Sequence, residues 1–215
     1  MAHEIELGPD EKVRDRPFAD PSHTRREEDA LRLLLGHQRE RARAWCGEPS
    51  ESRRNVIIRE TDAAGLRHLL VVPETHALIQ ARDLLVVGFF GRPREDAQTA
   101  LLFDLEERLV AGMSGYAAHG LLSYYDLELV KGAYGNLILF TTPDGPARWR
   151  ENPVHRRAVD VSPGNYHEIR LHQGTLSGRF LDAGTLRVTR TRYLDYSEPE
   201  VWRAVRWVSE PTSQG

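Results

Sequence analysis

Residues Asp83–Gly91, with the sequence DLLVVGFFG, decide the fold of this chain. The apolar side chains follow one another without the alternation of a half-exposed strand, which is typical of a β-strand buried on both faces. Such a strand needs neighbours within a sheet and a covering layer on each side. The segments around it therefore determine what kind of sheet this is.

The residues after this strand predict a helix and then a hairpin. Residues 94–112 carry leucines on one helical side and charged side chains on the other, which is typical of a helix covering a sheet. Residues 121–130 and 136–142 are expected strands, and the loop between them contains glycines where a hairpin turn needs them.

A second helical segment follows the hairpin. Asp144 can cap it, and Asn152–Pro153 indicates a restart, because asparagine suits the N-cap and proline the first helical position. The residues Ser162–Asn165 predict a turn, and residues 166–173 a strand. A further strand is expected over 185–193, and a short last helix over 198–208.

The order from Asp83 onward is thus β-α-β-β-α-β, with one more strand at the end. This order is the ferredoxin-like plan, in which two helices cover one face of an antiparallel sheet. The other face must also be covered. We expect a second sheet from a twin chain to do this and to enclose a cavity, so the predicted fold class is α+β and ferredoxin-like.

The first 80 residues extend this domain. Residues 1–22 are polar and contain several prolines, which predicts a flexible arm. Apolar residues then recur at helical spacing from Leu31 to Trp45, after a capping-box pattern at Thr24 and Glu27. Two β-rich runs around Asp62–Gly65 predict a hairpin. The expected domains are 1–22 as the arm, 23–80 as the helix and hairpin extension, 81–208 as the ferredoxin-like domain, and 209–215 as a tail.

Composition excludes several classes of function. The 215 residues carry a net charge of −3, so no overall basic field would hold nucleic acid. Cys46 is the only cysteine, which rules out an intrachain disulfide. No apolar run approaches the roughly 18–20 residues of a membrane span, and the first residues lack the apolar centre of a secretion signal. We therefore expect a cytoplasmic protein that binds neither nucleic acid nor membranes.

The expected strand 166–173 carries a row of polar side chains. Because side chains alternate along a strand, one side holds Tyr166, Glu168, Arg170 and His172. Facing a cavity, this row could bind an anionic or carbonyl-bearing ligand, with His172 as acid or base and Arg170 stabilising an oxyanion. The alternative is a ladder of ion pairs on a solvated face.

Two other groups could join this row. Tyr124 and Asp126 share one face of the strand 121–130, and a cavity shared with Arg170 and His172 would make a convergent polar cluster in a small-molecule site. His119, just before that strand, either reaches the cavity mouth or is a plain loop histidine.

The element order and the segment RWRENPVHRRAV, residues 148–159, resemble the dimeric α/β-barrel superfamily, which includes antibiotic-biosynthesis monooxygenase-like and haem-degrading proteins. The segment is similar to their second helix, with its Trp … Pro-x-His pattern. The resemblance covers about residues 83–193. It implies a homodimer with the dimeric α/β-barrel fold, in which each barrel holds a ligand cavity. The haem-degrading members also carry an asparagine on the first strand, which LLVVGFF lacks.

His155 is the candidate ligand of this segment. A neutral imidazole can bind haem or another metal, so His155 is a candidate haem ligand or proton-transfer group; otherwise it is a surface or capping histidine. Trp149 is expected in the core or the cavity wall.

The sequence therefore predicts a small-molecule enzyme that acts on a hydrophobic or aromatic metabolite in bacterial secondary metabolism. Oxygenation, with haem as a possible cofactor, is the first reaction expected. The alternatives are an acid–base isomerase or cyclase in the same cavity, or a non-catalytic ligand-binding or assembly protein. The candidate catalytic residues are His172, Arg170 and His155, and the candidate substrate-binding residues are Tyr124, Asp126, Tyr166, Glu168, Trp149 and His119.

Overall fold

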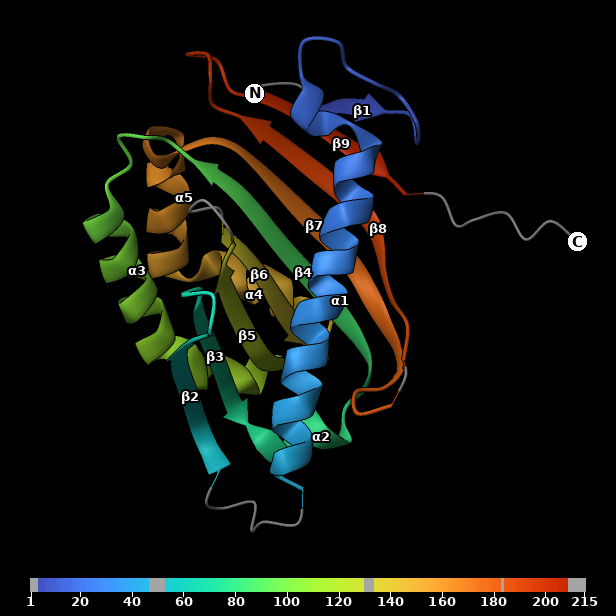
Figure 1. Ribbon diagram of the computed structural model, residues 1–215, viewed down its shortest axis with the longest axis vertical. Coiled ribbons are helices and arrows are strands. Elements are labelled where there is room, and N and C mark those ends of the chain that lie inside the picture. The colour runs from blue at the N-terminus through green and yellow to red at the C-terminus, as the bar shows by residue number, and fades with distance from the viewer. Residues whose placement is uncertain (1–3, 47–52, 130–133, 183, 209–215) are drawn as a thin grey trace, which may run out of the picture.

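The computed structural model describes residues 4–46, 53–129, 134–182 and 184–208. Within these residues one sheet of nine strands has the order β1-β9-β8-β7-β4-β6-β5-β3-β2 (Figure 1). The strands are β1 (Ile5–Leu7), β2 (Arg54–Thr61), β3 (Arg67–Glu74), β4 (Arg82–Pro93), β5 (Leu121–Glu128), β6 (Tyr134–Phe140), β7 (Tyr166–Arg179), β8 (Leu186–Asp195) and β9 (Trp202–Trp207). The helices are η1 (Pro17–Ala19), α1 (Pro21–Ala44), α2 (Thr75–Gln80), α3 (Thr99–Gly112), η3 (Met113–His119), α4 (Asp144–Glu151) and α5 (Pro153–Asn165).

The centre of the sheet follows the ferredoxin-like plan. Strands β7, β4, β6 and β5 lie side by side and are antiparallel, and the chain visits them in the order β4-α3-β5-β6-α4-α5-β7. The restart between α4 and α5 lies where the sequence predicts it. The Asn152 side chain accepts a hydrogen bond from the Val154 backbone N–H at 2.8 Å and so caps α5.

One face of the sheet is covered by α1, which crosses in front of it in Figure 1. The buried leucines of α1 pack with Leu84 and Val86 of β4. The helix comes so close at Gly88 that an added Cβ would lie 2.9 Å from a methyl carbon of Leu31. The chain's own helix thus covers a face on which a twin sheet was expected. The homodimer itself remains a prediction.

The opposite face is covered by α3, α4, α5 and η3. Leu109 and Val110 of α3 and Trp149 of α4 form an apolar cluster with Tyr124 and Ile138 of the sheet. The two helix-covered faces explain why β4 is apolar from Leu84 to Gly91, between its charged ends. No helix in the described ranges is long and apolar enough to cross a membrane.

The N-terminal segment differs from the expected flexible arm. Strand β1 pairs in parallel with β9, and Phe18 of η1 is buried. The Arg206 side chain, 1% exposed, donates hydrogen bonds to the carbonyl oxygens of Glu11 and Ala19, each at 2.8 Å. A guanidinium has several fixed donors, so one buried arginine can hold several backbone carbonyls of this segment.

Three local predictions were wrong. Residues 202–207 form a strand instead of a helix, because β9 finds backbone partners in both β8 and β1. Residues 162–165 belong to α5 instead of a turn, although Pro163 lies within that helix. Helix α1 begins earlier than the capping-box pattern at Thr24 and Glu27 predicts. Its cap is Asp20, whose side chain accepts a hydrogen bond from the Ser22 backbone N–H at 2.8 Å.

Candidate functional site

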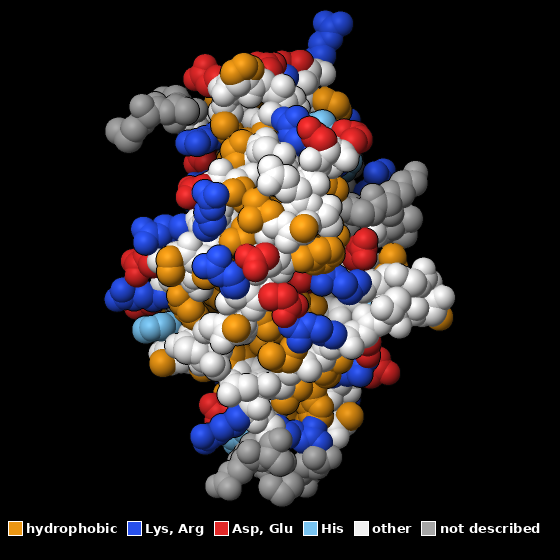
Figure 2. All heavy atoms as spheres, turned by 90° about the vertical axis from the view of Figure 1, so that its left-hand side faces the viewer, with side chains coloured by type: hydrophobic (Ala, Val, Ile, Leu, Met, Phe, Trp, Pro, Cys, Tyr) orange, Lys and Arg blue, Asp and Glu red, His pale blue; other side chains and the backbone are white. Residues whose placement is uncertain are grey.

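A cavity of about 1560 Å³ lies between the sheet and the helices α3, α4 and α5. Its walls are mostly apolar, and they include Val87 and Phe89 of β4, Ile138 of β6, and Leu102, Leu105 and Leu109 of α3. Figure 2 views the molecule from the left-hand side of Figure 1, where apolar side chains lie among charged ones. An apolar cavity with a few polar groups is the usual form of a small-molecule site.

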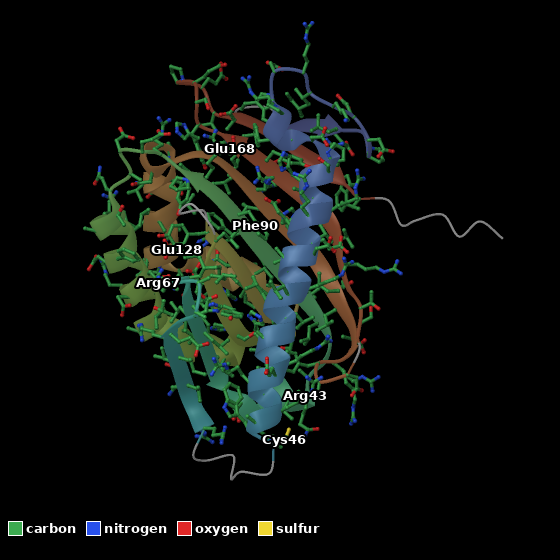
Figure 3. The ribbon with its side chains drawn as sticks, viewed as in Figure 1. Arg43, Cys46, Arg67, Phe90, Glu128 and Glu168 are labelled. Carbon is green, nitrogen blue, oxygen red and sulfur yellow. The ribbon has the colours of Figure 1, made fainter. Side chains whose placement is uncertain are left out.

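The cavity wall holds a polar cluster centred on β5 and β6. The amide nitrogen of Asn136 donates hydrogen bonds to the Tyr124 hydroxyl, at 2.9 Å, and to the Asp126 carboxylate. Arg67 of β3 lies 3.5 Å from the same carboxylate and bonds Glu106 of α3 at 2.7 Å. Tyr124 and Asp126 thus border one cavity, and Figure 3 shows Arg67 on the side of α3.

Three members of this cluster were missed from the sequence: Arg67, Glu106 and Asn136. Asn136 stands directly opposite Asp126 across the hairpin β5–β6, so the hairpin register could have identified it. Arg67 and Glu106 lie 39 residues apart in the chain, and no local pattern links them.

The carboxyl of Asp126 has an unusual environment. Burial, and next the negative charge of Glu106, raise its pKa to about 8, although Arg67 opposes the shift. Only 3% of the residue is exposed. A carboxyl with a pKa near neutrality can both accept and return a proton, which is the property of a general acid or base.

An aromatic group forms another part of the wall. The Trp149 ring lies 5.7 Å from the His155 ring and 6.3 Å from the Tyr124 ring, centroid to centroid. Burial, with the charge of Arg150 added, lowers the pKa of His155 to about 4, so its imidazole is neutral at pH 7. Its Nδ1 atom is buried, and no described residue bonds it.

Tyr166 reaches the cavity by a different route from the one predicted. Arg92 pairs with Glu168, but Pro93 pairs with Tyr166, so the register shifts by one residue there. A β-bulge of this kind reverses the alternation of side chains. The prediction that Tyr166 shares a face with Glu168 is therefore wrong. Its ring packs edge-on against Phe89, with centroids 5.7 Å apart.

Arg170 and His172 lie on the opposite face of the sheet, under α1. Arg170 Nη2 is 2.6 Å from a carboxylate oxygen of Glu27, and His172 Nε2 is 2.8 Å from the other. His172 Nδ1 lies 2.9 Å from the Thr191 hydroxyl. Phe90, labelled in Figure 3, packs against the His172 ring on this side, with centroids 5.5 Å apart.

The predicted convergence of Arg170 and His172 with Tyr124 and Asp126 is thus wrong. Although His172 is among the residues that border the cavity, its side chain is fully buried and bonded to Glu27. The cause is the carboxylate of Glu27 on α1, which binds the side chains of both Arg170 and His172, the residues that the sequence assigned to catalysis. Glu168 is paired with Arg92 at 2.9 Å and with Arg170 at 3.4 Å.

His119 does not join the site either. It lies in η3, is exposed, and is not among the residues that line the cavity. Its ring lies 6.1 Å from that of Tyr116. Among the described residues, no group of three or more histidines, cysteines or carboxylates could hold a metal ion.

Comparisons with known proteins found two similar solved structures. One is a dimeric ferredoxin-like protein of unknown function from Thermobifida fusca, with 14% identity, 45% of this chain and 93% of that chain covered, and a TM-score of 0.33. The other is SnoaB, a cofactor-independent oxygenase from Streptomyces nogalater, with 16% identity, 46% and 95% coverage, and a TM-score of 0.32. No protein-family model matches the chain, and no curated protein matches it.

The haem prediction is corrected by this comparison. SnoaB, the similar structure with a stated activity, is a cofactor-independent oxygenase. The prediction of a haem cofactor, with His155 as its ligand, is therefore wrong.

Proposed function

We propose that this protein binds an apolar, aromatic small molecule in the cavity and that Asp126 exchanges a proton with it. The observation that carries the proposal is a buried carboxyl, with its pKa raised to about 8, at the wall of an apolar cavity of about 1560 Å³. Such a group has the pKa of an efficient acid–base catalyst at neutral pH. The cavity is large enough for a ligand of several rings.

The neighbours of Asp126 suit a proton transfer. In its charged form Asp126 would take a proton from an acidic C–H or O–H bond of the ligand. The resulting ligand anion would lie near Arg67, whose buried Nε–H donates no hydrogen bond to any described residue. Tyr124 can donate its hydroxyl hydrogen, since burial raises the pKa of this phenol well above its usual value.

The fate of the anion separates two activities. Return of the proton to another atom of the ligand would be an isomerisation. Attack of the anion on a carbonyl carbon of the same ligand, with the proton passed to that carbonyl oxygen, would be a cyclisation. Transfer of electrons from the anion to dioxygen would be a cofactor-independent oxygenation of the aromatic molecule, in keeping with a role in secondary metabolism. The proton step at Asp126 is common to both, so we assign that step first.

Solvent deuterium exchange tests the proton step. 2-Tetralone, an aromatic ketone with acidic C–H bonds, would be incubated with the protein in D₂O and followed by NMR, with binding measured through tryptophan fluorescence. We expect Asp126→Asn to bind the ketone within about threefold of wild type but to lose exchange by about 100-fold or more. Asp104→Asn, on the outer side of α3 and 62% exposed, is the matched control and should exchange normally.

Two outcomes would count against the proposal. Full exchange by Asp126→Asn would remove Asp126 from the chemistry. Binding without any exchange by the wild-type protein would favour a non-catalytic ligand-binding protein. An oxygen electrode, run on the same samples, would tell oxygenation from isomerisation, because only oxygenation consumes dioxygen.

A further inference from the structure

The two edges of the sheet differ in a way that points to a binding surface. Strand β1 has three residues, whereas β2 has eight and is paired with β3 without a bulge. Strand β2 contains no proline, and its outer side pairs with no other strand in the described ranges. In Figure 1 it lies at the lower left edge of the sheet. Asn55 has a left-handed backbone conformation (φ 54°), and the pairing with β3 runs without interruption from Val56 to Thr61. A long, open edge is a template for another strand.

The side chains of β2 are complementary to a second copy of the same strand. In an antiparallel pair centred on Ile57, Arg54 would face the partner's Glu60, and by symmetry this ion pair would form twice. Ile57, which is 42% exposed, would meet the partner's Ile57 on the twofold axis. Arg54 is exposed and forms no ion pair with another described residue, and Glu60 keeps 37% of its side chain exposed beside Arg41.

Neighbouring registers fit less well. A shift by two residues in one direction would place Arg54 opposite the partner's Ile58. A shift in the other direction would place Ile57 opposite the partner's Arg59. Each of these would separate the opposite charges that the centred register brings together. Charged side chains on an edge strand normally oppose such pairing. In the centred register, however, the positive charge of Arg54 lies opposite the negative charge of the partner's Glu60, so the two attract each other.

We infer that β2 is the interface through which two copies of this chain pair, edge to edge and antiparallel, with Ile57 on the twofold axis. The result is one sheet that continues through both subunits. This interface is separate from the cavity, whose lining includes no residue of β2, so it does not depend on the proposed function.

Disulfide trapping tests the register directly. In a Cys46→Ser background, Ile57→Cys should form a crosslinked dimer under mild oxidation, because directly opposed Cα atoms lie about 4.5–5.5 Å apart, within the range of a disulfide. Arg59→Cys is the matched control on the same side of the same strand. Its two copies would be offset by four residues, about 13 Å, and should crosslink at least about tenfold more slowly.

Sedimentation equilibrium tests the interface without crosslinking. The wild-type protein should be a dimer, and Ile57→Lys, which places two ammonium groups face to face, should raise the dimer dissociation constant at least about tenfold. Leu33→Lys, at an exposed leucine of α1 (56% exposed), should leave this dissociation constant unchanged. Circular dichroism would verify that every variant is folded.

A wild-type protein that stays monomeric up to about 200 µM, well above the range expected for a specific complex, would overturn the inference. So would a dimer that ignores Ile57→Lys, because its interface would then lie elsewhere. Faster crosslinking of Arg59→Cys than of Ile57→Cys would overturn the register.

Discussion

Replacing Glu27 with glutamine would test how α1 is held on the sheet. Glu27 is 8% exposed, and its carboxylate lies 2.6 Å from Arg170 Nη2 and 2.8 Å from His172 Nε2. Glutamine keeps the shape of the side chain but removes its charge. The buried guanidinium of Arg170 would then lose its nearer carboxylate and keep only that of Glu168, 3.4 Å away.

The expected cost follows from this burial. Removing one partner of a buried ion pair costs about 3–5 kcal/mol, and the amide oxygen of glutamine can still accept one hydrogen bond, so we expect about 3 kcal/mol. For a protein of this size each kcal/mol lowers the melting temperature by roughly 2–4 °C, which gives a decrease of about 6–12 °C. This is a large part of a typical stability of about 5–15 kcal/mol.

The effect of Glu27→Gln should depend on pH. Burial alone would raise the pKa of Glu27, but the hydrogen bonds from His172 and Arg170 and the charge of Arg170 outweigh it and lower the pKa. A carboxyl with a lowered pKa stabilises the native state above its unfolded pKa, about 4.3, and this contribution is lost as the pH falls through the native pKa. The difference between wild type and Glu27→Gln should therefore shrink at acid pH.

Urea unfolding followed by circular dichroism, at pH 7 and at pH 3, measures both effects. Asp29→Asn is the matched control on the same helix, because the Asp29 side chain is 75% exposed and its pair with Arg32 should contribute less than about 1 kcal/mol. A loss below about 1 kcal/mol for Glu27→Gln at pH 7 would refute the ion network as the anchor of α1.

Other predictions concern the cavity, the N-terminal segment and the break between α4 and α5. Because the pKa of Asp126 is raised, its carboxyl in the native state keeps a proton at pH values where the unfolded chain has lost it. The contribution of Asp126 to stability is therefore lost as the pH rises from about 4 to about 8. Urea unfolding at pH 5, 7 and 9 should show this fall in the wild-type protein and not in Asp126→Asn. Arg206→Lys should expose residues 4–20 to limited proteolysis at least about tenfold faster, since a lysine cannot reach the several carbonyls that Arg206 holds; unchanged cleavage would contradict this anchoring. Asn152→Ala should lower the free energy of unfolding by about 1 kcal/mol through loss of the α5 cap, and an unchanged thermal melt would show that the cap contributes nothing.

The sequence predicts the central elements of the sheet because their signals are local. The apolar run of β4, the amphipathic pattern of α3 and the asparagine–proline pair before α5 each need only neighbouring residues to be recognised. The strand order then follows from the order of elements. Tyr124 and Asp126 were predicted to share a face for the same reason, since they are alternate residues of a single strand.

The parts that the sequence mispredicted depend on distant partners. Arg170 and Glu27 are 143 residues apart, so nothing near β7 shows that its charges are used by α1. Strand β9 acquires its conformation from pairing with β1 and β8. The bulge that turns Tyr166 into the cavity is set by the pairing of β7 with β4 and has no signature in the order of residues.

The position of α1 also has a consequence for dilution. Where a twin subunit covers a sheet, the cover is lost when the protein is diluted below the dissociation constant of the dimer. Helix α1 belongs to the same chain as the strands it covers, so its effective concentration at the sheet does not change with that of the protein. The apolar surface beneath α1 should therefore remain hidden from water at nanomolar concentrations, whether or not the β2 edges of two chains have separated.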